Sequence, residues 1–176
     1  KDDDCFYIPM KADGRGRIYS RVPFLSFQAA DCGRYLLRFA EKTPIDARTE
    51  HWLKVGIANA GGNDKLSWDR RLHWFDKHRE EILNVACMTT TGDFRRAYDF
   101  LTLDEIDDPF ALAALANEYW KVFVDKSQEY TQVYVCIDCS CSGTSIFNAW
   151  RRNLHGARLT NLVDTAEPAD IYMGVW

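Results

Sequence analysis

Apolar residues recur at helical spacing in several stretches of this chain, and polar turn residues separate these stretches. The pattern predicts helices over residues 28–41, 49–60, 67–88 and 144–154, and a further helix that begins at residues 108–109. Ser67 suits an N-cap, and Pro109 occupies a first helical position, where proline is tolerated. Residues 61–64 and 89–92 contain Gly, Asn and Thr, so we expect the first to end a helix and the second to form a loop.

Two stretches have the pattern of strands. Residues 18–22 alternate, and they follow residues 13–17 (Asp-Gly-Arg-Gly-Arg), which have the composition of a turn. Residues 132–138 (Gln-Val-Tyr-Val-Cys-Ile-Asp) form the clearest strand and lead into small residues at 140–143. The chain is therefore predicted to be mostly helical, with a few strands that need partners to form a sheet.

The composition is typical of a globular domain with a real core. Of the 176 residues, 47% are hydrophobic, 14% aromatic and 27% charged. No apolar run approaches the roughly 20 residues that cross a bilayer, so we expect no membrane association. The acidic start at residues 1–4 has the character of neither a secretory signal nor a basic transit peptide. Both ends are abrupt, and we expect a segment of a longer chain.

The net charge of −4 gives no overall attraction to nucleic acid. A group of early arginines offers a local basic patch instead: Arg15, Arg17, Arg21, Arg34 and Arg38. The alternative is that these arginines only cover a solvated surface or form ion pairs with nearby acids such as Asp31, Glu41 and Asp46.

Six cysteines invite a disulfide or metal interpretation, but their spacing supports neither. Cys136 and Cys139 have C-x-x-C spacing, yet no second pair exists to complete four zinc ligands. On a strand these two side chains would face opposite sides. We therefore expect reduced thiols, with Cys136 as a small apolar core residue.

The acid at the end of the predicted strand carries the sharpest chemical question. Hard cations such as Mg²⁺ prefer oxygen ligands and commonly take one or two carboxylates together with substrate phosphates. Asp138 at a strand end, followed by small residues, suits such a site. The alternative is that Asp138 caps the next turn or helix through its side chain.

Two separated stretches resemble motifs of one family. Residues 13–19 resemble the D-x-x-G-R-x-Y element of the single-subunit, bacteriophage-type (phage and mitochondrial) DNA-directed RNA polymerases. Residues 137–143 (Ile-Asp-Cys-Ser-Cys-Ser-Gly) resemble motif A of that family, D-G-S-C-S-G. Residues 41–45, 52–61 and 163–172 resemble further family segments in the same order, so the resemblance covers nearly the whole chain.

The resemblance implies an α+β palm segment that is mostly helical, with a small antiparallel sheet and a helical insertion. It divides the chain into a first palm segment with the D-x-x-G-R turn (1–45), the helical insertion (46–128), and the motif A strand with the following helix, leading toward the fingers (129–176).

The resemblance also implies a reaction, nucleotidyl transfer by two Mg²⁺ ions during DNA-directed RNA synthesis. Asp138 matches the catalytic, metal-binding aspartate, and the backbone of Cys139 matches a supporting metal ligand. Positions that match nucleic-acid contacts of the family are Arg15, Arg17, Tyr19, Arg34 and Arg152. The implied partners are a DNA template, an RNA product and ribonucleoside triphosphates.

Motifs B and C of the family have no counterpart in this chain, so the remaining polymerase regions are also implied partners. With one catalytic carboxylate, the segment alone is expected to be inactive. The implied location is the cytoplasm of an infected host cell, with a mitochondrion or plastid as the alternative.

Three departures from the family pattern affect these expectations. Ser145-Ile146 stands where the family has Gln-His, which removes polar groups near the site. Cys139 replaces a glycine, and Gly14 replaces an aromatic or aliphatic residue. Two other classes stay open from the sequence: a non-catalytic nucleic-acid-binding or interaction module on the same fold, and an unrelated helical protein with a thiol site.

Overall fold

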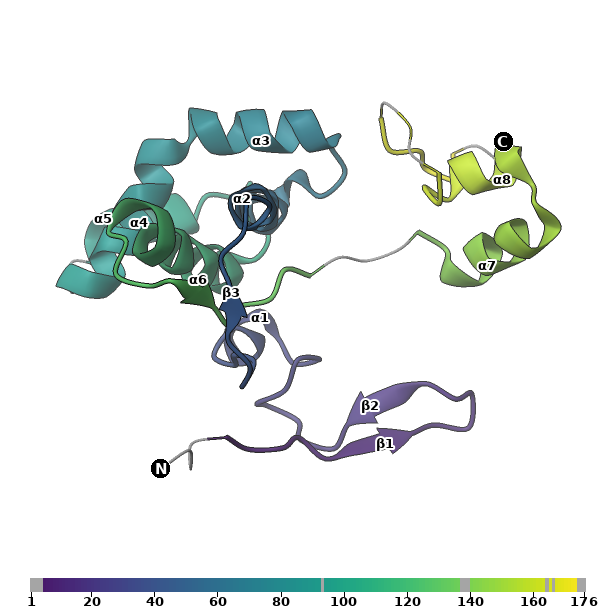
Figure 1. Ribbon diagram of the computed structural model, residues 1–176, viewed down its shortest axis with the longest axis horizontal. Coiled ribbons are helices and arrows are strands. Elements are labelled where there is room, and N and C mark those ends of the chain that lie inside the picture. Colours follow the sequence, from purple (N-terminus) through teal and green to yellow (C-terminus); the bar gives the residue numbers. More distant parts are fainter. Residues whose placement is uncertain (1–4, 93, 137–139, 164, 166, 174–176) are drawn as a thin grey trace.

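The structure is a computed structural model that describes residues 5–92, 94–136, 140–163, 165 and 167–173. A helical body makes up most of it, and a two-stranded hairpin and a pair of helices extend from that body (Figure 1). The helices are α1 (Asp31–Arg34), α2 (Thr49–Ala58), α3 (Trp68–Lys77), α4 (Arg79–Thr91), α5 (Phe94–Leu101), α6 (Pro109–Tyr119), α7 (Ser142–Arg151) and α8 (Leu154–Leu159). Two π-helical turns are η1 (Asn59–Asn63) and η2 (Trp120–Val124). The strands are β1 (Met10–Ala12), β2 (Ile18–Ser20), β3 (Thr43–Pro44) and β4 (Tyr130–Thr131). The expected fold class, mostly helical α+β with small antiparallel sheets, is confirmed.

The hydrophobic core lies between α2, α4 and α6, with α3 and α5 packed around them. Its fully buried large side chains are Ile57, Phe75, Ile82, Leu112 and Leu115. Burial of each such side chain contributes about 1.5–3 kcal/mol. These apolar positions recur at helical spacing in the sequence, and the helices α2 and α6 were predicted from that spacing. Pro109 lies in the first turn of α6, as expected.

Two glycines end the helical stretch of α2 and η1 where the sequence predicted an end, and their backbone angles lie outside the helical range. Gly61 and Gly62 leave helical angles inside η1, and Gly62 has φ +79°. A Cβ on Gly62 would lie 2.6 Å from the backbone oxygen of Glu105, and a Cβ on Gly61 would overlap the ring of Trp74. Gly62 therefore needs to be glycine, because its φ is positive and the backbone of Glu105 lies close to it, whereas a side chain at Gly61 would require the Trp74 ring to move.

The single helix predicted over residues 67–88 is wrong, because the structure divides it into α3 and α4. The division is at His78, which has φ −101° and ψ +19° and whose N–H still bonds to Trp74. The change of direction lets α3 pack on α2 while α4 packs on α6. A straight helix of that length would not reach both surfaces.

The loop predicted at residues 89–92 is also wrong in part, since α4 continues through Thr91. Gly92 then caps it in the left-handed region at φ +77° and donates to the carbonyl of Met88. The helix α5, which follows, was not predicted.

The helix predicted over residues 28–41 is reduced to the single turn α1. Beyond Tyr35 the chain runs alongside a distant segment: the N–H of Phe39 bonds to the carbonyl of Gln132 at 2.9 Å. The Gln132 side-chain amide donates back to the Phe39 carbonyl at 2.9 Å. Bonds between segments so far apart in sequence replace the local helical bonds that the apolar spacing had predicted.

The strand predicted over residues 132–138 is wrong for the part that the structure describes. The ladder is short, with Thr43 opposite Thr131 and Pro44 opposite Tyr130 in antiparallel register. Residues 132–136 continue beyond it without forming a strand, and residues 137–139 lie outside the described residues. Val135 packs against α2, where a Cβ on Gly56 would come within 3.0 Å of its side chain.

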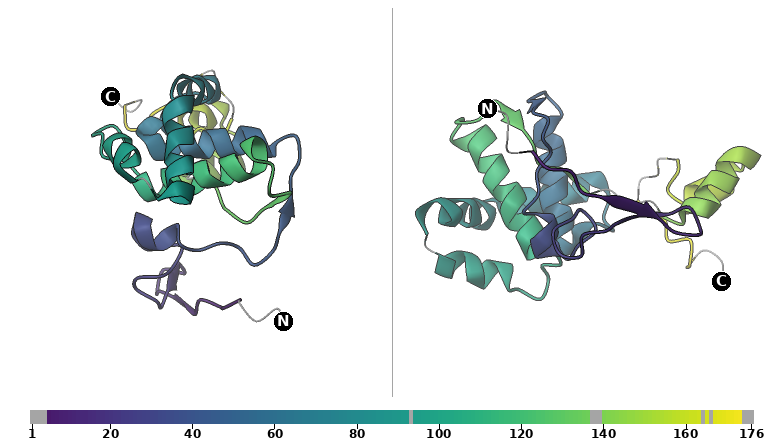
Figure 2. Two further views of the ribbon diagram at one scale, coloured as in Figure 1. Left: turned by 90° about the vertical axis from the view of Figure 1, so that its left-hand side faces the viewer. Right: turned by 90° about the horizontal axis from the view of Figure 1, so that it is seen from below.

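The hairpin β1–β2 and the pair α7–α8 extend from the same side of the helical body, as Figures 1 and 2 show. In the hairpin, Met10 lies opposite Ser20 and Ala12 opposite Ile18. The helix predicted over residues 144–154 is confirmed as α7, shifted toward the N-terminus, and α8 follows it after a tight turn.

Candidate nucleic-acid and metal site

The hairpin turn is built around one carboxylate. Asp13 accepts hydrogen bonds from the backbone N–H groups of Arg15 at 2.8 Å and Arg17 at 2.9 Å. Gly16 completes the turn in the left-handed region at φ +77°. Both bonds lower the pKa of Asp13 below its ordinary value of 3.8, and the bond from Arg17 has the larger effect. The motif D-x-x-G-R is thus a self-contained turn that presents its arginines.

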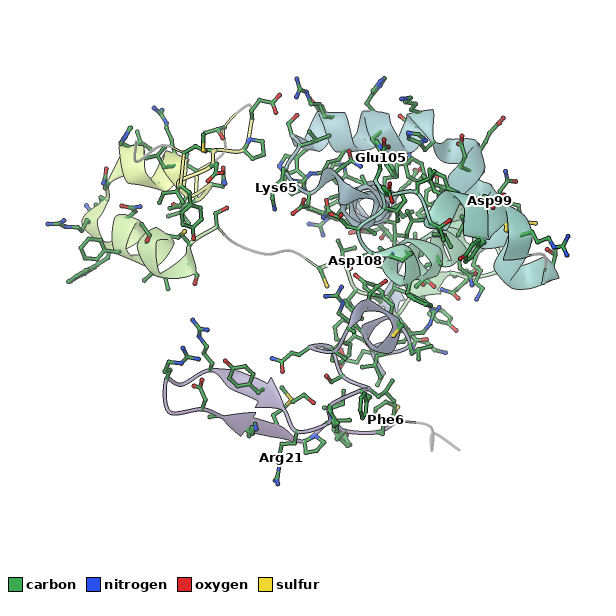
Figure 3. All side chains as sticks on the ribbon, turned by 180° about the vertical axis from the view of Figure 1, so that it is seen from behind. Phe6, Arg21, Lys65, Asp99, Glu105 and Asp108 are labelled. Atoms are coloured by element: carbon green, nitrogen blue, oxygen red, sulfur yellow. The ribbon has the colours of Figure 1, made fainter. Side chains whose placement is uncertain are left out.

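The predicted nucleic-acid residues of the hairpin lie together at its loop end. Arg15 and Arg17 are exposed, and Tyr19 in β2 is half-buried opposite Lys11. Arg15 reaches back to the Asp13 carboxylate at 3.4 Å. Figure 3 shows side chains with nitrogen ends extending from this loop into solvent.

Arg34, by contrast, is occupied within the protein. Its guanidinium pairs with Asp108 at 3.3 Å, its side chain is 23% exposed, and it lies 5.2 Å from the Tyr35 ring. Asp108 precedes α6, at the junction with α1 (Figure 3). The acids considered from the sequence as partners for the arginines did not include Asp108. This ion pair joins the first segment to the helical body.

Asp31 strengthens the same junction in a way that sequence reasoning missed. Its carboxylate accepts the N–H groups of Phe110 at 2.7 Å and Ala111 at 3.0 Å, which are free donors in the first turn of α6. Burial, acting against these bonds, raises the pKa of Asp31. A cap supplied from another segment carries no local sequence signal.

An aromatic cluster leads from this junction toward residue 136. Tyr134 lies 5.1 Å from the rings of Phe27 and Tyr35 and 5.7 Å from that of Phe39. Its hydroxyl donates to a backbone carbonyl of α1 at 2.6 Å. Burial raises the pKa of Tyr134 to about 12. The segment that approaches motif A is thereby held against the first segment.

Cys136 was predicted as a core residue, and that prediction is wrong. Its side chain is exposed, and the Tyr35 hydroxyl lies 3.6 Å from its sulfur. Because residues 132–136 form no ladder, alternate side chains here do not divide into a buried and an exposed face. The cysteines that the structure describes are free thiols, as expected: Cys5, Cys32, Cys87, Cys136 and Cys141.

Asp138 and Cys139, the two predicted metal ligands, lie outside the described residues. The chain is described again from Ser140, and Cys141 has a left-handed backbone at φ +48° just before α7. The Ser145 hydroxyl is directed back to the carbonyls of Ser140 at 2.9 Å and Cys141 at 3.3 Å. The hydroxyl of Ser145 therefore stabilises the turn that precedes α7.

Arg152 ends α7 in a left-handed conformation at φ +53°, and its side chain is exposed. It lies at the tight turn between α7 and α8, where Asn153 caps α8 by accepting the N–H of Gly156. The structure does not bring Arg152 into contact with the hairpin arginines among the residues it describes.

Two features are absent from the described part of the chain. No group of three His, Cys, Asp or Glu side chains there could hold a metal ion. None of the helices described is both long enough and apolar enough to cross a membrane.

The chain belongs to the DNA-dependent RNA polymerase family, whose model matches residues 43–176. The resemblance to the single-subunit, phage-type members is confirmed. The chain is 34% identical to DNA-directed RNA polymerase 2, chloroplastic/mitochondrial, of Arabidopsis thaliana. It is 35% identical to DNA-directed RNA polymerase 1B, mitochondrial, of Nicotiana tabacum. Each alignment covers 99% of this chain and 17% of the relative, so the chain spans about a sixth of these relatives.

Proposed function

We propose that this chain is the palm segment, containing motif A, of a single-subunit DNA-directed RNA polymerase. One observation carries the proposal: similarity to such polymerases extends over 99% of the chain. The covered chain contains residues 13–19 and 137–143, which resemble the D-x-x-G-R-x-Y element and motif A. In this proposal Asp138 is one of the carboxylates at which nucleotidyl transfer takes place. A non-catalytic nucleic-acid-binding module is the competing outcome of the experiment below.

The donor atoms of this segment suit magnesium. The carboxylate of Asp138 and the backbone carbonyl of Cys139 are oxygen ligands, which Mg²⁺ prefers, and the neighbouring cysteines would contribute only thiols. When bound, two Mg²⁺ ions neutralise charge on the transferred phosphates and activate the attacking hydroxyl. This chain supplies one ligand set, and the second aspartate belongs to the polymerase regions with motifs B and C.

The hairpin supports a role in holding nucleic acid. Arg15 and Arg17 are exposed at a turn made rigid by Asp13, and the hairpin extends from the same side of the body as α7 (Figure 1). Arginines on phosphates fix the register of a template or RNA–DNA hybrid without reading its sequence. Tyr19 and Arg152 are proposed as further nucleic-acid contacts. Arg34 pairs with Asp108, so its proposed contribution is indirect, through the junction between α1 and α6.

The relatives also support proposals about the activity of the isolated segment and about the cellular compartment of the protein. A chain that spans 17% of a polymerase and holds one catalytic carboxylate would not synthesise RNA alone. Because the relatives are named as mitochondrial or chloroplastic enzymes, we infer a mitochondrion or plastid rather than an infected host cell.

The test is Asp138→Asn in the full-length polymerase that contains this chain, with Asp125→Asn as the matched control. Asp125 is exposed and follows η2. We expect transcription to fall at least about 10³-fold, because a lost metal ligand removes several kcal/mol of transition-state stabilisation. Template binding should persist, and the control should transcribe normally. Normal transcription by Asp138→Asn would refute the assignment of Asp138, and a wild-type protein that binds template without transcribing would be a non-catalytic binding module.

A further inference from the structure

One face of α7 carries large side chains that the described part of the protein leaves exposed. Trp150 is 80% exposed, Ile146 71% and Phe147 48%. Trp150 lies four residues after Ile146 and three after Phe147, so the three side chains share this face of the helix. Ser145 and Asn148, by contrast, are buried. Neighbouring apolar side chains left exposed in this way commonly mark a binding surface.

The rings on this face are arranged together with a guanidinium group. The ring centroids of Phe147 and Trp150 are 6.2 Å apart, and the planes meet at 62°. The guanidinium carbon of Arg151 lies 5.0 Å from the centroid of the Phe147 ring. We call Ile146, Phe147, Trp150 and Arg151 the stacking face. Aromatic rings and arginine guanidinium planes are the groups on which unpaired nucleic-acid bases stack.

The charge around the stacking face has one sign. Residues 140–163 contain three arginines, one histidine and no aspartate or glutamate, although the whole chain has a net charge of −4. Arg151, Arg152 and Arg158 are exposed, and none of them pairs with an acid among the residues that the structure describes. Figure 3 shows side chains with nitrogen ends extending outward from the α7–α8 pair. Such guanidinium groups complement a phosphate backbone.

We propose that the stacking face of α7 binds a single strand of DNA, with bases on the rings of Trp150 and Phe147 and phosphates on the neighbouring arginines. Intact duplex does not suit these rings, because its bases are already stacked on one another. The inference rests on the proposed function, since copying a DNA template separates two strands. The new RNA pairs with the template, so the occupant is the displaced DNA strand.

The first measurement asks whether the face is open in the whole protein and whether a strand covers it. The full-length polymerase that contains this chain is saturated with an unlabelled RNA–DNA hybrid, which fills the template site, and no Mg²⁺ or nucleotide is added. Hydroxyl-radical oxidation of each residue is then measured by mass spectrometry, with and without an oligothymidylate of about 20 nucleotides, longer than most single-strand sites.

Trp150 should be oxidised readily without the oligothymidylate, and about 5-fold more slowly when the strand stacks on it. Tyr98 in α5 is the control residue, because it is 66% exposed and lies on another part of the fold. Its oxidation should not change when the strand is added.

The second measurement is the affinity of the same saturated polymerase for fluorescent oligothymidylate, by anisotropy over a series of salt concentrations. Trp150→Ala should weaken binding at least about 5-fold, and Trp150→Phe, which keeps a ring, should recover most of the affinity. Arg151→Gln should weaken binding and reduce the salt slope by about 0.7, the value for one phosphate contact on a single strand. Tyr98→Ala should bind as wild type does.

Three results would overturn the inference. If Trp150 is protected before the oligothymidylate is added, another part of the polymerase covers the face. If Trp150→Ala binds oligothymidylate as tightly as wild type does, the rings do not hold the strand. If oligouridylate of the same length binds more tightly than oligothymidylate and protects Trp150, the occupant is RNA and not displaced DNA.

The results also separate this inference from the proposed function, because neither measurement needs catalysis. If Asp138→Asn transcribes normally while Trp150→Ala loses the strand, the assignment of Asp138 fails and the stacking face stands. If Asp138→Asn is inactive while Trp150→Ala binds the strand normally, only the stacking face is lost.

Discussion

The ion pair between Arg38 and Glu118 gives the sharpest stability prediction. The Glu118 side chain is 0% exposed, and Arg38 donates to its carboxylate at 2.9 Å. Gln128 donates to the other carboxylate oxygen at 2.7 Å and also to the Tyr130 carbonyl at 2.6 Å. The pair therefore ties the first segment to α6 and to β4. Truncation in Arg38→Ala leaves a buried carboxylate with Gln128 as its remaining partner in the described structure.

The expected decrease in the free energy of unfolding of Arg38→Ala can be worked out from the exposed fractions of the two side chains. Removing one partner from a fully buried pair costs about 3–5 kcal/mol. The Arg38 side chain is 39% exposed, so water would reach the carboxylate from that side after truncation. We therefore expect a loss of about 2 kcal/mol. In urea, with an m-value of about 2 kcal/mol/M, the unfolding midpoint would fall by about 1 M.

The assay is urea unfolding of the 176-residue chain, followed by tryptophan fluorescence. A second substitution, Glu118→Gln, added to Arg38→Ala, removes the buried charge and should recover about half of the loss. Arg48→Ala is the control, because its pair with Asp46 at 3.2 Å is largely exposed, and its midpoint should not move. Equal midpoints for Arg38→Ala and Arg48→Ala, or no recovery in the double variant, would refute the reasoning.

Three further predictions concern the turns and the aromatic cluster. Gly62→Ala should lower stability by about 2–3 kcal/mol in the same urea assay, because φ is +79° and the new Cβ would lie 2.6 Å from the Glu105 oxygen; an unchanged midpoint would contradict this. The lowered pKa of Asp13 stabilises the hairpin turn above pH 3.8, and the stabilisation is lost as pH falls through the lowered pKa. NMR titration of the Arg17 amide should report that midpoint, and a midpoint at or above 3.8 would be inconsistent with the bonds described. Tyr134→Phe keeps the ring contacts but removes a hydroxyl bond of 2.6 Å, so unfolding should cost about 1 kcal/mol less, whereas a stabilised variant would count against that bond.

Local patterns identified the elements whose stability is local. The D-x-x-G-R turn folds on its own carboxylate, so residues 13–17 were interpreted correctly from sequence alone. The helices α2, α6 and α7 have apolar residues at helical spacing, and their bounds lie close to the predicted positions. The family was likewise readable from short motifs, because those motifs are contiguous in the chain.

In two places where the prediction failed, contacts between distant parts of the chain decided the structure. Phe39 pairs with Gln132 and not with a helical neighbour, so the helix over residues 28–41 reduced to one turn. The break at His78 follows from two surfaces that α3 and α4 must each cover. Neither partner surface can be read from a window of neighbouring residues.

The sequence by itself determined the family, the hairpin turn and the helices α2, α6 and α7, since these depend on side chains within a few positions of one another. Tertiary structure alone decided that Asp31 caps α6, that Arg34 pairs with Asp108, and that Asn161 reaches Ser140. Each of these contacts joins polar groups far apart in sequence. These contacts form only when the apolar core brings the segments together, so the spacing of residues in the sequence does not predict them.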